Sequence, residues 1–112
     1  MKDTEQKIRK KKDNTSSEST TVLKTIQAED LKVKGNECLK SGELDDAIGY
    51  YSKSLKVLVQ PHVLNNRSLA YYKKKYFTEA MEDANASIQL DSGIANVKAY
   101  LRRAMAKKSK GL

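Results

Sequence analysis

Apolar residues recur with helical spacing along most of the chain. The pattern begins near Val22 and Leu23 and continues almost to the C-terminus. Turn-forming residues interrupt it at Ser41-Gly42, Gln60-Pro61, Lys74-Lys75 and Asp91-Ser92-Gly93. The pattern therefore predicts five helices, over about 24–40, 44–59, 62–74, 77–90 and 94–109. Because the connections between them are short, we expect consecutive helices to pair as antiparallel hairpins in an all-α fold.

The first twenty or so residues lack this apolar pattern. They contain the basic run Arg9-Lys10-Lys11-Lys12, followed by a stretch rich in serine and threonine. Such a segment has too few apolar groups to offset the entropy lost on ordering. We expect residues 1–22 to form a flexible basic arm and residues 23–112 to form the folded domain.

The predicted helices contain an internal repeat. The small residues Gly35, Ser68 and Ala104 lie 33 and then 36 residues apart. Small side chains at these positions would let the first helix of a pair approach the second closely. Five positions of the first pair recur in the second: Leu31, Gly35, Cys38, Ala47 and Tyr51 correspond to Leu64, Ser68, Tyr71, Ala80 and Ala84.

With these intervals the chain resembles the tetratricopeptide repeat family over residues 28–109. The resemblance implies a superhelix of stacked helical hairpins, with repeats over about 28–60 and 61–95. A final helix of the first type, over about 96–109, would cap the stack. The chain departs from the family pattern in having no tryptophan and no proline at the end of a repeat. Residues 92–95 look like a two-residue insertion.

Donor-rich side chains lie on the first helix of each predicted pair. Lys32 and Asn36 are spaced i, i+4, and Lys98 and Arg102 repeat that spacing on the last helix. Asn66 lies on the helix between them. Because the first helices of a solenoid line its concave groove, we expect these side chains to meet there. Cations and amide donors together suit a pair of carboxylates.

The sequences around these five residues look like the dicarboxylate-clamp subclass of the family. That resemblance implies that Lys32, Asn36, Asn66, Lys98 and Arg102 hold the two terminal carboxylates of a chaperone tail ending Glu-Glu-Val-Asp. Lys73 would contact acidic residues upstream in the same peptide. The implied function is a cytoplasmic cochaperone adaptor whose partner is heat shock protein 90 or 70.

Two alternatives to a chaperone-tail adaptor stay open, and the net charge bears on one of them. Lysine and arginine number 22 against 14 acidic residues, a net charge of +8, which also suits nucleic acid or an acidic surface. In one alternative the repeats bind an internal peptide or another subunit of an assembly complex. In the other, the basic arm serves as a tether to nucleic acid or an acidic surface.

Several classes of function are disfavoured by composition. With one cysteine, Cys38, and one histidine, His62, neither a disulfide nor a Cys- or His-rich metal site is expected. We find no nucleophile–base pair and no glycine-rich phosphate loop, so we expect no catalytic residues, no cofactor and no enzyme activity. No apolar run approaches the ~18 residues of a membrane span, and we expect no membrane partner.

Overall fold

The computed structural model describes residues 2–93 and 96–111, with side chains described from residue 19 onward. Over these residues the chain forms only helices and turns, which confirms the all-α prediction. The helices are α1 (Lys2–Lys40), α2 (Leu44–Val57), α3 (Pro61–Lys73), α4 (Phe77–Leu90) and α5 (Val97–Ser109). Their bounds agree with the predicted ranges to within a few residues, except at the start of α1. The predicted start of the last helix, at 94–95, lies outside the described residues.

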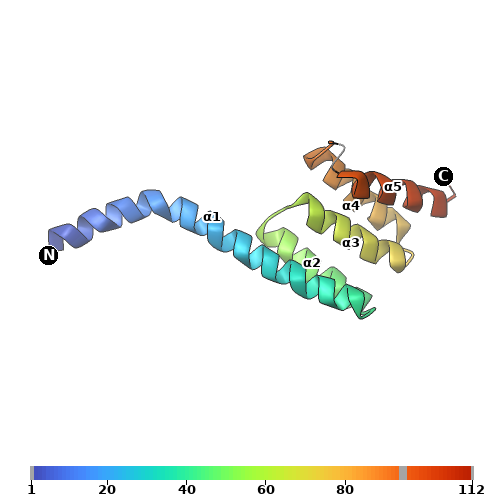
Figure 1. Cartoon of the computed structure of the whole chain (residues 1–112), viewed down its shortest axis with the longest axis horizontal. Coiled ribbons are helices and arrows are strands. Elements are labelled where there is room, and N and C mark those ends of the chain that lie inside the picture. The colour runs from blue at the N-terminus through green and yellow to red at the C-terminus, as the bar shows by residue number, and fades with distance from the viewer. Residues whose placement is uncertain (1, 94–95, 112) are drawn as a thin grey trace.

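Two hairpins and a single helix are stacked side by side (Figure 1). Helix α1 packs on α2, α3 packs on α4, and α2 joins the hairpins through its contact with α3. Helix α5 packs on α4 and also touches α3. The first half of α1 projects away from this stack (Figure 1).

Residues 2–22, which we predict to be a flexible arm, continue α1 as helical backbone. Lysine, glutamate, glutamine and arginine favour helix even where no tertiary contact is made, and they are frequent in residues 2–12. The division of the chain at residue 22 stays a prediction.

Small residues bring the helices of each hairpin together. A β-carbon added to Gly35 would lie 2.6 Å from the ring of Tyr51 in α2, so only glycine fits there. Ser68 is fully buried, and its hydroxyl donates a 2.6 Å hydrogen bond to the carbonyl oxygen of Ala80 in α4. Ala104, the third residue of this set, is exposed, because no described helix covers that side of α5.

The core lies between the hairpins. Tyr51 and Leu55 of α2 pack with Val63 and Leu64 of α3, together with two buried alanines. Cys38 is partly buried against this cluster, as expected for a cysteine on the apolar side of its helix. This packing fixes α1 and α3 relative to each other, and these helices carry four of the predicted site residues, Lys32, Asn36, Asn66 and Lys73.

Candidate functional site

Two of the predicted site residues are hydrogen-bonded to each other. The side-chain amide of Asn66 in α3 donates to Oδ1 of Asn36 in α1 at 3.0 Å. The same oxygen accepts a 2.5 Å bond from the hydroxyl of Tyr51 in α2. Because both bonds use Oδ1, the Nδ2 group of Asn36 is its remaining polar group, and it is a donor.

Lys32 lies on the same helix but is already paired. Its ammonium group binds the carboxylate of Glu29 one turn earlier, and its side chain is only 17% exposed. His62, at the start of α3, lies 4.0 Å from the other oxygen of that carboxylate. Lys32 lowers the pKa of Glu29, whereas burial is the main reason that the pKa of His62 is lowered. Glu29 and His62 were not predicted, since spacing along one helix does not show which acid a lysine will meet.

Lys98 borders a cavity where α3 and α5 begin. The cavity has a volume of about 740 Å³ and is also lined by His62, Asn65 and Asn96. The Asn65 side chain donates a 2.9 Å hydrogen bond to Oδ1 of Asn96, which links α3 to the residue before α5. His62 therefore lies beside the Lys32–Glu29 pair and also lines the cavity that Lys98 borders.

Arg102 is half-buried and has no ion pair among the described residues. Its Nε is buried without a hydrogen-bond partner in the described part of the chain. Burial lowers the pKa of its guanidinium, with the Tyr72 hydroxyl acting weakly in the opposite direction. A partly buried cation with an unused donor is energetically costly, and an incoming carboxylate would relieve that cost.

The structure places the predicted residues as follows. Asn36 and Asn66 are in direct contact. Lys98 and Arg102 share one side of α5, one turn apart. Lys73, predicted as a secondary contact, is exposed at the end of α3. The meeting of all five residues around one ligand stays a prediction.

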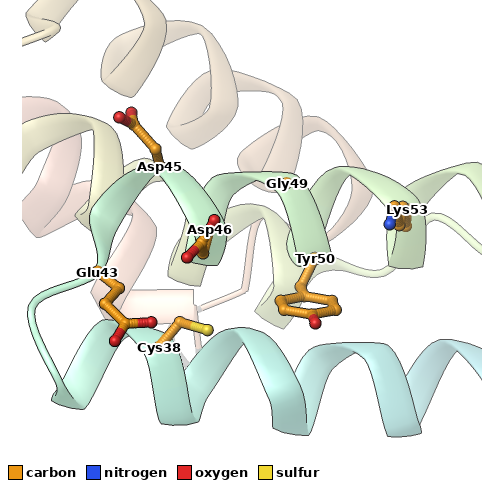
Figure 2. Close-up of a pocket in the computed structure, with 7 residues that line it drawn as sticks. All are labelled: Cys38, Glu43, Asp45, Asp46, Gly49, Tyr50 and Lys53. Atoms are coloured by element: carbon orange, nitrogen blue, oxygen red, sulfur yellow. The ribbon is translucent and has the colours of Figure 1, made fainter.

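A second cavity lies between α1 and α2, with a volume of about 330 Å³ (Figure 2). Its lining includes Cys38, Glu43, Asp45 and Asp46. Asp45 points away from α1 (Figure 2). Its carboxylate forms an ion pair with Lys74. Burial is the main reason that the pKa of the Cys38 thiol is raised, and the acidic neighbours add to the effect. Acidic side chains do not suit an anionic ligand, so this cavity is a poor match for the predicted site.

The described part of the chain offers neither a metal site nor a membrane span. Within residues 19–93 and 96–111, whose side chains are described, no group of histidine, cysteine, aspartate and glutamate side chains could hold a metal ion. None of the helices described is both long enough and apolar enough to cross a bilayer.

The stacked hairpins and their repeated contacts define an α-helical repeat protein. Two solved structures have the same arrangement. The first tetratricopeptide domain of Spaghetti (RPAP3) bound to the HSP90 peptide SRMEEVD is 35% identical, with a TM-score of 0.72. The alignment covers 76% of this chain and 68% of that one. The second such domain of human RPAP3, in complex with the HSP70 peptide SGPTIEEVD, is 30% identical with a TM-score of 0.73, and the coverage is 79% and 72%.

The chain belongs to the tetratricopeptide repeat family. No family model matches it. Among curated proteins, sperm-associated antigen 1 of Mus musculus is 42% identical over 81 residues, which is 72% of this chain and 9% of that protein. The heat shock protein sti1 homolog of Schizosaccharomyces pombe is 41% identical over 81 residues, 71% of this chain and 13% of that protein. The chain thus spans about a tenth of the length of these relatives.

Proposed function

We propose that this chain is an adaptor that binds the acidic C-terminal tail of heat shock protein 90 or 70. The observation that carries the proposal is the bond between Asn36 and Asn66, which brings two of the five predicted contact residues together from separate hairpins. Support comes from the two solved relatives, whose bound peptides both end in Glu-Glu-Val-Asp.

In the proposed complex the asparagines and the cations have different roles. Nδ2 of Asn36 donates to a carboxylate oxygen of the chain end, and Lys32 and Lys98 supply positive charge. Arg102, which has no partner for its Nε among the described residues, binds the second carboxylate. Because the peptide is short and must be ordered on binding, we expect an affinity of about 1 μM, or about −8 kcal/mol. The affinity should fall as salt screens these charges.

Calorimetric titration with Met-Glu-Glu-Val-Asp, as the free acid and as the C-terminal amide, tests this function. Amidation removes one of the two terminal carboxylates, so binding should weaken by at least about tenfold. Equal affinities for the two peptides would instead favour recognition of an internal peptide, the alternative that the sequence leaves open.

A further inference from the structure

The carboxylate of Glu29 faces two basic side chains. One of its oxygens binds the ammonium group of Lys32, one turn later on α1, and the other lies 4.0 Å from Nε2 of His62 at the start of α3. That distance is too long for a hydrogen bond. The side chains of His62 and Glu29 are 52% and 47% exposed, so a change of side-chain conformation can bring them together. Glu29 therefore lies between a permanent cation and a residue that is cationic only when protonated.

Binding of the acidic chain end requires Lys32 to change its partner. Lys32 is one of the five residues assigned to the peptide carboxylates, so this inference rests on the proposed function. If Glu29 stayed on the ammonium group, its carboxylate would lie beside those of the peptide, and like charges at that distance repel. Glu29 therefore has to turn away from Lys32, and without a replacement cation it loses a charge-assisted hydrogen bond.

His62 is the residue placed to receive that carboxylate. It lines the cavity at the starts of α3 and α5, where the charged groups are Lys98 of α5 and Asp91 of the loop before α5. Lys98 is assigned to the peptide, and Asp91 is itself an acid whose Oδ1 accepts a 3.2 Å bond from a backbone amide. Among the described residues, the basic side chains that lie beside Glu29 are thus Lys32 and His62.

The charge of His62 depends on the same two neighbours. Burial and the nearby Lys32 ammonium group lower the pKa of His62, whereas Glu29 acts in the opposite direction. The ring is therefore mainly neutral near pH 7 in the free chain. Once a peptide carboxylate neutralises Lys32 and Glu29 turns to the ring, both changes favour the protonated form.

We propose that His62 takes up a proton when the acidic chain end binds, and that the protonated ring then holds the Glu29 carboxylate released by Lys32. The proton comes from solvent, and both ring nitrogens are donors once it is bound. His62 is a positioning residue in this arrangement, because it acts on the peptide through Glu29 and Lys32. Binding that takes up a proton is stronger at low pH, so the affinity should rise as the pH falls from about 8 to about 5.5.

Proton nuclear magnetic resonance of the full chain tests the proposal. The chain has a single histidine, so the ring signals of His62 are identified without ambiguity. N-acetylated Met-Glu-Glu-Val-Asp is the probe, because acetylation removes a peptide amine that would titrate in the same range. Saturation with this peptide should move the midpoint of the His62 titration to higher pH. Calorimetric titration should correspondingly show about threefold tighter binding at pH 5.5 than at pH 8.

Three variants show whether the coupling passes through Glu29. His62→Gln should bind with nearly the same affinity at both pH values, which a purely structural role of the histidine would not produce. Glu29→Gln should still bind, but the peptide should then leave the His62 titration almost unchanged. Asp91→Asn, which removes the other carboxylate at the cavity, should respond as wild type does. An unchanged His62 titration in wild type, or a full response in Glu29→Gln, would overturn the proposal.

The peptide site and the proton uptake can fail separately. No binding of the acetylated peptide at any pH would contradict the proposed function and the proton uptake together. Binding that weakens on C-terminal amidation but leaves the His62 titration unchanged would support the proposed function and overturn only the role of His62.

Discussion

Asn36 links the chemistry of the candidate site to the packing of the first hairpin. Its Oδ1 accepts hydrogen bonds from Tyr51 and from Asn66, so its orientation is fixed from two other helices. Asparagine is unfavourable in the middle of a helix, and these two bonds give the residue a structural use at this position. They also leave its donor group as the part that can meet a ligand.

The Tyr51 hydroxyl should make the stability of the chain depend on pH in the alkaline range. Burial raises the pKa of Tyr51 to about 12, whereas the unfolded residue titrates near 10. The unfolded state therefore releases this proton first, and stability should fall as the pH rises from about 10 to about 12. Urea unfolding at about pH 8 and pH 11 should show a smaller loss for Tyr51→Phe than for wild type. Tyr50→Phe is the neighbouring control, and identical losses in all three proteins would argue against a buried Tyr51 hydroxyl.

Glu29 should weaken the proposed site by occupying Lys32. We expect Glu29→Gln to bind Met-Glu-Glu-Val-Asp about threefold more tightly than wild type, because the ammonium group is then available to the peptide. Asp30→Asn removes the same charge from an exposed neighbouring position that forms no ion pair among the described residues. If Asp30→Asn tightens binding as much as Glu29→Gln, the effect is one of net charge and not of the Lys32–Glu29 pair.

At the scale of the elements, both hairpins use the same turn. After α1 the amides of Gly42 and Glu43 donate to the carbonyl oxygens of Leu39 and Cys38, and Gly42 has a φ of +80°. After α3, Lys75 takes the place of Gly42, with a φ of +67°. A side chain in this region of backbone conformation is strained.

Lys75→Gly should therefore stabilise the chain by about 1 kcal/mol, since glycine adopts this conformation without a steric penalty. Lys74→Gly should instead destabilise it, because Lys74 has an ordinary helical φ of −80° and pairs with Asp45. Chemical denaturation measures both changes. A destabilised Lys75→Gly would mean that the Lys75 side chain contributes more than its backbone strain costs.

The second hairpin should depend strongly on the ion pair between Arg67 and Asp83. Asp83 is 6% exposed, so its loss leaves a largely buried arginine without its partner. We expect Asp83→Asn to lower the free energy of unfolding by about 3 kcal/mol. Glu82→Gln, at the exposed neighbouring position, should change it by less than about 0.5 kcal/mol. Similar effects of the two substitutions in urea titrations would mean that the Arg67–Asp83 pair does not hold the second hairpin together.

The sequence predicts the helices well because apolar period and turn residues are local properties. It does not predict the polar contacts that fasten the hairpins. Ser54 and Ser87 donate to the carbonyl oxygens of Ala28 and Pro61, at 2.7 and 3.1 Å, and both pairs are separated by 26 residues. Which distant carbonyl oxygen accepts a bond from a serine hydroxyl depends on how the helices stack. No local sequence pattern specifies that stacking.

At the scale of the whole molecule, the repeat register accounts for what could be predicted of the candidate site. It aligns Asn36 and Asn66 on neighbouring first helices, and the structure has them in contact. The repeat register does not predict that Lys32 pairs with Glu29, and it does not predict that Arg102 is half-buried. Both depend on side-chain conformations and on the separation of the helices, which are fixed only in the folded stack.

Helix α5 carries Lys98 and Arg102, which we assign to the acidic chain end in the proposed complex. The absence of acidic residues from α5 suits an anionic ligand. The proposed peptide site remains the central claim, because it assigns the function of the repeats.

Calorimetric titration of Met-Glu-Glu-Val-Asp into wild type and Lys98→Ala tests that claim most directly. Lys107→Ala, which removes an exposed charge from the same helix, is the control. We predict that Lys98→Ala weakens binding by about tenfold or more, while Lys107→Ala stays within about twofold of wild type. Equal binding by Lys98→Ala and wild type would contradict the assignment of the site.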